Sequence, residues 1–401
     1  MGAIGFEIEA THERARAAII RTPHGDIHTP ALCPVATQAT VKSLAPHELT
    51  ALGAEIVLAN AYHLYLRPGA DLVASFGGLH RFMSWDGPMI TDSGGWQVFS
   101  LGFGREHGVG KIASLFPDEA EGITPSRGQR PRLTRVDQDG VTFTSHIDGS
   151  THRFTPEISI SVQERLGPDL ILAFDECTSP LHDERYTAEA LERTHRWARR
   201  CLDARTRDDQ GLLGIVQGGA YESLRRESAS FIASLPFDGF AIGGSLGRSK
   251  DDMRSVLDWT LPALPDERPR HLLGIGEPHD IFDAVERGID TFDCVDPTRL
   301  ARRGVLFTPD GRLNATSARY REDFTPIDAA CGCYTCANFT RAYLRHLFAA
   351  GELLAYRLAT IHNLAFMLGL MRRIREATVR QELSELRAEF EARWDSAEPS
   401  E

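Results

Sequence analysis

The segment LLGIVQGG (212–219) is followed by an amphipathic stretch, ESLRRESASFIASL (222–235), and then by a second apolar run, GFAIGG (239–244). The two apolar runs do not alternate with polar residues, which is typical of strands buried on both faces of a parallel sheet. The helical spacing of apolar residues between them predicts a crossover helix. These residues therefore predict a strand–helix–strand unit of an α/β fold.

The same pattern extends in both directions along the chain. Further short apolar runs occur at PALCPVAT (30–37), EIVLAN (55–60), PMITDSGG (88–95), DLILAFDE (169–176), HLLGIGE (271–277) and DTFDCV (290–295). Eight strand–helix units predict a closed (β/α)8 TIM barrel. An open doubly wound sheet is the alternative, but no GxGxxG motif follows an early strand. Alternating residues over 6–36, around the turn TPHGD (22–26), predict an N-terminal hairpin.

The composition narrows the class of protein. The 401 residues carry a net charge of −12, and 42% of them are hydrophobic, which is ordinary for a globular chain. The acidic balance argues against a nonspecific nucleic-acid binder. We found no apolar run of the roughly 18 residues that a membrane span needs, and no apolar signal core. We therefore expect a cytoplasmic protein without membrane contact.

Three of the seven cysteines cluster as C-x-C-x-x-C, at Cys331, Cys333 and Cys336. Thiolates at this spacing can bind one Zn²⁺ ion, and a tetrahedral site needs a fourth ligand. The candidates are His362 and His346. We favour His362, because its longer sequence separation from the cysteines leaves room for a helix and for the chain to return to the cluster. Three thiolates and an imidazole fill the coordination shell, so we expect one structural Zn²⁺ per subunit.

The chain divides unevenly. A long Gly- and Pro-containing connection, 102–139, interrupts the strand–helix pattern, and the composition becomes helical from the cysteine cluster onward. We therefore expect a barrel over 1–327 with an insertion at 102–139. A zinc-binding helical subdomain over 328–392 is expected to close against the barrel, and a tail over 393–401 is expected to be disordered.

Polar residues or glycines end most of the predicted strands. They are Asn60, Asp92, Asp175, Gln217, Gly243, Gly244 and Asp293. In a barrel these ends converge on one mouth, where catalytic residues lie. Each of them alone can instead cap a helix or begin a turn. Three acids and a glutamine at equivalent strand ends favour a functional site.

Taken together, these segments resemble the tRNA-guanine transglycosylase family, the queuine tRNA-ribosyltransferases, of bacterial type. The resemblance runs through nearly the whole chain. Its segments are RTPHGDIHTPA (21–31), NAYHLYLRPG (60–69), ITDSGGWQVFSL (90–101), HIDGS (146–150), ILAFDECTSP (171–180), GIVQGG (214–219), FDGFAIGG (237–244), GIDTFDCVDPTR (288–299) and HNLAFML (362–368). It implies an irregular TIM barrel with an N-terminal hairpin and an inserted C-terminal zinc subdomain.

The resemblance implies a pentosyltransferase of queuosine biosynthesis. Such enzymes exchange the wobble guanine of target tRNA anticodons for a 7-deazaguanine. It implies that Asp293 attacks the ribose and forms a covalent aspartyl–ribose intermediate. Asp92 is implied as the general acid and base, with Asn60 orienting it.

The implied substrate-binding set lies at the same strand ends. Its members are Asp175, Gln217, Gly244, Trp96, Leu273, Ser93 and Asn60. Asp175 is implied to accept from the purine N1–H and exocyclic amine, and Gln217 and the Gly244 backbone to contact the carbonyl oxygen. Trp96, where the family usually has Tyr or Phe, and Leu273 are implied to sandwich the ring.

The implied partners are tRNA, guanine and a free 7-deazaguanine base, and the implied assembly is a homodimer. Arg299 and Arg302 follow the nucleophile at motif positions that contact the anticodon loop. They begin an arginine-rich stretch over 299–321. Arginine can bind phosphate and flanking bases in such a loop. A solvated basic face is the alternative interpretation.

The segment GGSLGRSK (243–250) departs from the usual bacterial GGLAVGE. Gly247 stands where many members specific for 7-aminomethyl-7-deazaguanine (preQ1) have valine, and Ser249 replaces the glutamate. Eukaryotic members also have glycine there and take the bulkier queuine. We favour preQ1, because the rest of the chain is of bacterial type. A queuine-using enzyme, a DNA-directed transglycosylase and a noncatalytic tRNA-binding subunit are the alternatives.

Overall fold

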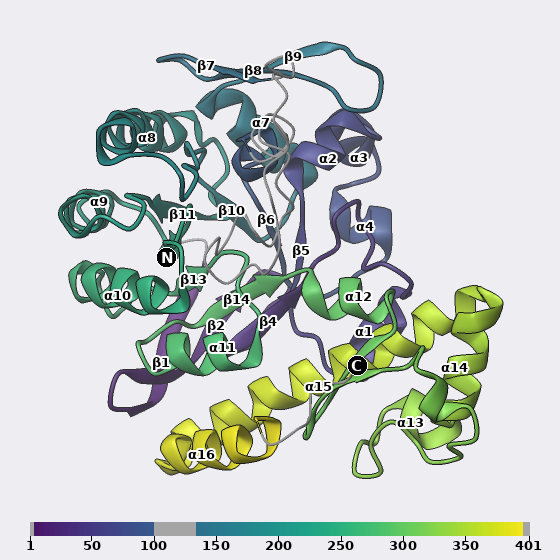
Figure 1. Cartoon of the computed structure of the whole chain (residues 1–401). Coiled ribbons are helices and arrows are strands. Elements are labelled where there is room, and N and C mark those ends of the chain that lie inside the picture. Colours follow the sequence, from purple (N-terminus) through teal and green to yellow (C-terminus); the bar gives the residue numbers. More distant parts are fainter. Residues whose placement is uncertain (1–3, 100–133, 396–401) are drawn as a thin grey trace.

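The computed structural model describes residues 4–99 and 134–395. At its centre, eight parallel strands pair in the order β4-β14-β13-β12-β11-β10-β6-β5 (Figure 1). A parallel bridge from Val35 to Leu58 joins the two edge strands, so the sheet is a nearly closed barrel. The strands are β4 (Ala31–Pro34), β5 (Val57–Ala59), β6 (Met89–Thr91), β10 (Leu170–Leu172), β11 (Gly211–Val216), β12 (Gly239–Ile242), β13 (Arg270–Leu272) and β14 (Thr291–Cys294). Each overlaps one predicted apolar run, and the predicted fold class is confirmed.

Helices surround the barrel because each carries one apolar face. They are α1 (Pro46–Leu52), α2 (Ala61–Leu66), α3 (Ala70–Ser75), α4 (Leu79–Met83), α7 (Pro156–Leu166), α8 (Glu184–Ala204), α9 (Glu222–Ala233), α10 (Lys250–Thr260), α11 (Pro278–Val285) and α12 (Asp296–Ala301). Within the described ranges, 3-10 turns span Leu261–Ala263 and Ala318–Tyr320. In α8, Leu191 and Ala198 are buried seven residues apart, two helical turns along one face.

Two three-stranded antiparallel sheets accompany the barrel in the described part of the chain. The predicted N-terminal hairpin is β2 (Ala15–Thr22) and β3 (Gly25–Thr29), and β1 (Gly5–His12) adds a third strand to it. A second sheet contains β7 (Thr134–Val136), β8 (Val141–Thr144) and β9 (Thr151–Phe154). Most of the predicted insertion, 102–139, lies outside the described residues, and its last part supplies β7.

The C-terminal region wraps around one side of the barrel (Figure 1). It contains the hairpin β15 (Val305–Thr308) and β16 (Gly311–Asn314), and the helices α13 (Tyr334–Asn338), α14 (Arg341–Ala350), α15 (Leu353–Arg380) and α16 (Leu383–Trp394). The expected disordered tail, 393–401, begins with two residues of α16, and residues 396–401 lie outside the described chain. The domain boundary near residue 328 stays a prediction.

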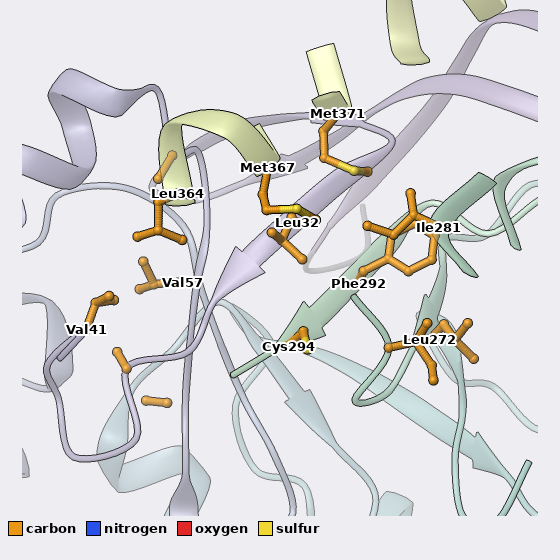
Figure 2. Close-up of a cluster of buried hydrophobic side chains, with 14 of the residues drawn as sticks. Leu32, Val41, Val57, Leu272, Ile281, Phe292, Cys294, Leu364, Met367 and Met371 are labelled. Carbon is orange, nitrogen blue, oxygen red and sulfur yellow. The ribbon is translucent and has the colours of Figure 1, made fainter. Parts of the chain in front are cut away.

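Helix α15 packs against β4 and β2 and links the C-terminal region to the barrel. Figure 2 shows Leu364 and Met367 of this helix beside Val57 and Leu32 of the barrel. Among the described helices, α15 has the length and apolar composition of a membrane span, and 61% of its most apolar window is buried inside the fold. Its apolar residues are therefore those of a core helix.

Candidate active site and metal cluster

The predicted functional side chains gather where the barrel strands end. Asn60 follows β5, Asp92 follows β6, Asp175 lies three residues beyond β10, Gln217 follows β11, Gly243 and Gly244 follow β12, Leu273 follows β13, and Asp293 lies in β14. In addition to burial, the charge on Asp293 raises the pKa of Asp92, and the charge on Asp92 raises that of Asp175. These three carboxylates therefore share one electrostatic environment at the C-terminal mouth of the barrel.

Asp92 is held from three directions. Its Oδ1 accepts a hydrogen bond from the Ala61 backbone N–H at 2.8 Å, and its Oδ2 accepts from Gln97 Nε2 at 2.6 Å and from Asn60 Nδ2. Asn60 occupies the N-cap position of α2, and among the described residues its side chain makes no capping bond. The side chain of Asn60 thus serves Asp92 rather than its own helix.

Burial raises the pKa of two of these carboxyl groups. Desolvation raises the pKa of Asp92 to about 6, although hydrogen bonds from Asn60, Ala61 and Gln97 act in the opposite direction. Desolvation likewise raises the pKa of Asp175 to about 6 against the hydrogen bonds of Gln217 and Ser93. A carboxyl group with a pKa near 6 can both give and take a proton close to neutral pH, which suits a general acid and base.

Asp293 is positioned by its neighbours in the barrel. Its Oδ1 accepts a hydrogen bond from the Gly274 backbone N–H at 2.9 Å and lies 3.2 Å from His271 Nε2. His271 Nδ1 lies 2.9 Å from Thr291 Oγ1, so the ring is fixed from both sides. Both contacts of Asp293 use Oδ1, and the side chain is 15% exposed at the mouth, where a substrate can approach it.

The sequence did not identify His271 or Gln97 as residues that contact the candidate catalytic acids. His271 lies on β13, two residues before Leu273, which directly follows the strand. Side chains two residues apart along an extended segment face the same side. That alternation was the available signal for His271. Gln97 follows Asp92 across a turn into a helical stretch, 95–99, and no simple periodicity pairs the two.

The implied base-binding residues surround Asp175. Its Oδ2 accepts from Gln217 Nε2 at 2.5 Å, and its Oδ1 accepts from Ser93 Oγ at 3.3 Å. Gln217 Oε1 is buried without a hydrogen-bond partner in the described part of the chain. This oxygen faces Gly244, whose φ of +78° favours glycine and where a Cβ would lie 1.9 Å from the oxygen. The amide of Gln217 therefore donates to the carboxylate oxygen that is expected from the sequence to accept from a purine.

Leu273 lies against this group, since its Cδ1 would be 3.1 Å from a Cβ built on Gly243. Trp96 is half-buried in the 95–99 helical stretch, three residues after Ser93. Both are placed near the ends of barrel strands. Their sandwiching of a ring remains a prediction.

Arg225 holds the two glycine loops beside Gln217. Its guanidinium donates to the carbonyl oxygens of Gly219, Val216, Gly243 and Ser245, at 2.7 to 3.1 Å. The side chain is fully buried, and desolvation lowers its pKa to about 9. The planar guanidinium group of Arg225 thus fixes the loop after β11 and the loop after β12 relative to each other.

The backbone explains why residues 243–250 depart from the usual bacterial segment GGLAVGE. Gly247 has φ +104°, and a Cβ there would lie 2.1 Å from Asp252 Cβ. Ser249 caps α10: its hydroxyl accepts from the Asp252 N–H at 3.2 Å, and Asp252 accepts from the Ser249 N–H at 3.2 Å. Glycine and serine therefore suit this backbone, whereas valine at 247 would clash.

The two predicted tRNA-contacting arginines lie on or beside α12, close to Asp293 in sequence. Arg299 Nη1 donates to Asp296 Oδ1 at 3.1 Å, and Arg302 Nη1 donates to the Thr298 carbonyl at 2.7 Å. Desolvation lowers the pKa of Arg302, and the charges of Arg299 and Arg303 act in the same direction. A concentration of positive charge thus lies beside the mouth.

The cysteine cluster assembles as predicted. The sulfurs of Cys331, Cys333 and Cys336 lie 3.9, 3.7 and 3.3 Å from His362 Nδ1. His362 Nε2 lies 2.6 Å from the Phe307 carbonyl, which requires the proton on Nε2 and leaves the Nδ1 lone pair facing the sulfurs. The four ligand atoms lie within 4.8 Å of one another, so they can hold one metal ion. The donor set suits tetrahedral Zn²⁺, and His362 rather than His346 joins it.

Comparison with known proteins gives matches over nearly the whole chain. The family model described as "Queuine tRNA-ribosyltransferase" matches residues 11–396. A queuine tRNA-ribosyltransferase of Herpetosiphon aurantiacus is 53% identical over 373 residues, covering 93% of this chain and 88% of that protein. Another, of Roseiflexus sp., is 50% identical over 406 residues, covering 96% and 99%. A putative queuine tRNA-ribosyltransferase of Archaeoglobus fulgidus is 49% identical over 397 residues, covering 96% and 98%.

Such matches, on a barrel with acids at its mouth, define an enzyme of the pentosyltransferase class. The chain belongs to the queuine tRNA-ribosyltransferase family. The resemblance inferred from the sequence segments is thereby confirmed.

Proposed function

We propose that this chain exchanges the wobble guanine of target tRNAs for a 7-deazaguanine in queuosine biosynthesis. One observation carries the proposal: Asp293, fixed by Gly274 and His271, shares the mouth with Asp92, whose pKa burial raises to about 6. A double displacement at a sugar carbon needs two such groups: a fixed carboxylate that attacks the carbon, and a carboxyl group that transfers a proton to and from the base.

In the first displacement, a carboxylate oxygen of Asp293 attacks C1′ of the ribose, and the bond from C1′ to the guanine nitrogen breaks. Asp92 in its acid form gives its proton to the departing base, and an aspartyl–ribose ester remains. In the second displacement, Asp92 removes a proton from the incoming base, whose nitrogen attacks C1′ and releases Asp293. Two inversions retain the configuration at C1′.

Base recognition in this proposal exploits the arrangement around Asp175. An entering purine offers its N1–H and exocyclic amine to the Asp175 carboxylate and replaces the hydrogen bond from Gln217 Nε2. The released amide of Gln217 then donates to the purine carbonyl. Burial raises the pKa of Asp175, and a bound purine should lower it again, since two donors stabilise the charged form.

The incoming base is proposed to be preQ1, because the chain as a whole is of bacterial type and its relatives in Herpetosiphon and Roseiflexus cover nearly all of it. Gly247 does not by itself open room for queuine, because Asp252 fills the space that a valine side chain would take. Exchange rates with preQ1 and with queuine on the same tRNA decide between them. A higher kcat/KM for queuine would overturn the preference for preQ1.

The decisive test of the reaction uses labelled guanine with tRNA or with duplex DNA. We expect label in tRNA only, whereas label in DNA would favour a DNA-directed enzyme, and no exchange would favour a noncatalytic subunit. D293N should abolish both the exchange and the denaturant-stable protein–RNA adduct. An adduct that persists in D293N would mean that another group is the nucleophile.

Three further proposals concern tRNA binding, the metal ion and the assembly. Arg299 and Arg302 are proposed to contact the anticodon loop from beside the nucleophile. The cysteine cluster is proposed to bind one structural Zn²⁺, since four protein ligands leave no position for a reactive water. A homodimer is proposed as the assembly of the family.

A further inference from the structure

A cavity of about 340 Å³ lies between the N-terminal sheet and the end of the barrel opposite the candidate active site. Ile8 and Thr11 of β1 line one side of it, and Leu261 and Leu264, which follow α10, line another. Arg270, the first residue of β13, reaches the cavity from the barrel. The volume falls within the range of roughly 300–1,000 Å³ that is typical of small-molecule pockets. Neither the base exchange nor the cysteine cluster uses any of these residues.

Two buried guanidinium groups line this cavity, and they share one buried carboxylate. Arg16 is 3% exposed, Arg270 is 5% exposed, and Asp290 is fully buried. Asp290 Oδ1 accepts a hydrogen bond from Arg16 Nε at 3.1 Å, and its Oδ2 accepts from the Arg270 backbone N–H at 2.7 Å. The guanidinium of Arg270 pairs instead with Asp266, whose side chain is 80% exposed. The buried group therefore contains two positive charges and one negative charge, which is an unfavourable balance away from water.

Arg270 has hydrogen-bond donors that its neighbours leave unused. Its Nη2 donates to the Leu264 carbonyl oxygen at 2.8 Å and to Asp266 Oδ1 at 2.7 Å. Its Nε is buried without a hydrogen-bond partner among the described residues. Its Nη1 lies beside Gly288, where a Cβ would be 3.0 Å away, so glycine adds no side chain next to this nitrogen. Burial and then the charge on Arg16 lower the pKa of Arg270, and a bound anion would supply both a hydrogen-bond acceptor and a compensating charge.

Two further arginines line the cavity and share a single aspartate. Arg14 Nη1 donates to Asp258 Oδ1 at 3.0 Å, and Arg287 Nε donates to Asp258 Oδ2 at 3.3 Å. Arg287 Nη1 also donates to the Asp283 carbonyl oxygen at 2.8 Å. A guanidinium group has five N–H donors, so both arginines keep donors for a ligand. The acids of the lining, Glu13 and Asp266, are exposed to solvent, which screens their charges.

We propose that this cavity binds a small organic phosphate monoester. Arg14, Arg270 and Arg287 have donors to spare, and a phosphate monoester offers three acceptor oxygens and nearly two negative charges. Planar guanidinium groups bind such oxygens in pairs, with charge-assisted hydrogen bonds. The buried side chains of Leu261 and Leu264 suit an apolar portion of the ligand, which favours an organic phosphate over the inorganic ion.

The test titrates the untagged full-length protein with phenyl phosphate in a calorimeter. Phenol lacks the phosphate, inorganic phosphate lacks the apolar ring, and benzoate replaces the phosphate with a carboxylate. Arg270→Lys keeps the charge but removes Nε and the planar group, and Arg14→Gln changes an exposed position. Arg21→Gln is the matched control, because Arg21 of β2 also pairs with a carboxylate, Glu7, at 2.6 Å, but does not line the cavity.

We expect the wild type and Arg21→Gln to bind phenyl phosphate with the same Kd. Arg14→Gln should raise the Kd severalfold, and Arg270→Lys should raise it about tenfold or more, the usual effect of losing a charged hydrogen bond. Phenol and inorganic phosphate should bind much more weakly than phenyl phosphate. Phenyl phosphate should also raise the Tm of the wild type and of Arg21→Gln, because it binds only the folded chain.

Absence of binding by the wild type at millimolar phenyl phosphate would overturn the proposal. An unchanged Kd in Arg14→Gln and Arg270→Lys would also overturn it, because the ligand would then bind elsewhere on the molecule. Tighter binding of benzoate than of phenyl phosphate would show that the cavity selects carboxylates. The exchange activity is not a readout here, so failure of the proposed function would leave these outcomes unchanged.

Discussion

Burial in the fold raises the pKa of the Asp175 carboxyl group. The side chain is 5% exposed, and desolvation raises its pKa from 3.8 to about 6. The folded chain therefore binds this proton more tightly than the unfolded chain does. Stability falls as the pH rises from about 4 to about 6, and the ionised group continues to cost stability above that range.

Asp175→Asn should therefore stabilise the protein at alkaline pH while it weakens base binding. The shift from 3.8 to about 6 corresponds to roughly 3 kcal/mol at most, and about half of this remains at pH 5. Urea unfolding at pH 8 and pH 5 measures the difference. Asp208→Asn, at an exposed position, is the control and should change little at either pH. A stability gain that does not depend on pH would contradict this cause.

Arg225 is proposed as a positioning residue, because all four hydrogen bonds of its buried guanidinium go to carbonyl oxygens of the loops after β11 and β12. Arg225→Lys keeps the charge and loses the planar fork. We expect the KM for the free base to rise about tenfold or more, since a charged hydrogen bond contributes roughly 1.5–3 kcal/mol. The KM for tRNA should change much less.

The matched control is Arg226→Lys, because Arg226 is exposed and pairs with Glu222. A purely structural role for Arg225 would lower Tm without separating the two KM values. Full activity of Arg225→Lys would show that the charge alone is sufficient.

At this scale, the sequence predicted which residues gather at the mouth but not how they bind one another. Asp92 follows a recognisable strand and Asp293 lies near the end of another, so their location could be read from the chain. Arg225 could not, since an arginine on an amphipathic helix normally faces solvent. Its burial depends on two glycine loops that come together only in the closed barrel.

At the scale of elements, the sequence predicted all eight barrel strands, because buried parallel strands form short apolar runs. It also predicted α8 and α9 from their helical periodicity. The third strand of the N-terminal sheet, β1, was not distinguished from the rest of the alternating segment. Short helices such as α3 and α4 were missed, because five or six residues carry too little periodicity.

The start of α10 gives a prediction for a single element. Ser249 and Asp252 cap each other's backbone N–H groups. Ser249→Ala should destabilise the protein by about 1 kcal/mol, the usual contribution of an N-cap. Ser249→Thr retains the hydroxyl and should lose only a small part of this, which denaturant unfolding can measure. Equal losses in both variants would mean that the cap is unimportant.

At the scale of the whole molecule, the cysteine cluster and α15 act together. His362 belongs to α15, and Cys331, Cys333 and Cys336 come from the preceding loop and α13. The same helix packs against β4. A metal ion bound by the cluster would therefore fix a helix that covers the barrel.

Removal of the metal should destabilise the barrel as well as the C-terminal region. A chelator, with loss of zinc verified by metal analysis, should lower the Tm by several degrees, and added Zn²⁺ should restore it. Cys336→Ser should respond weakly to added Zn²⁺. An unchanged Tm after verified zinc removal would show that α15 packs independently of the metal.

The junction of β4 with its neighbours also determines the order in which the newly made chain can fold. Strand β4 leaves the ribosome first among the barrel strands, yet it pairs with β14 and is covered by α15, which are made much later. Its apolar face and one strand edge stay uncovered through most of synthesis. Nascent chains that stop before α15 should therefore be aggregation-prone and good chaperone substrates.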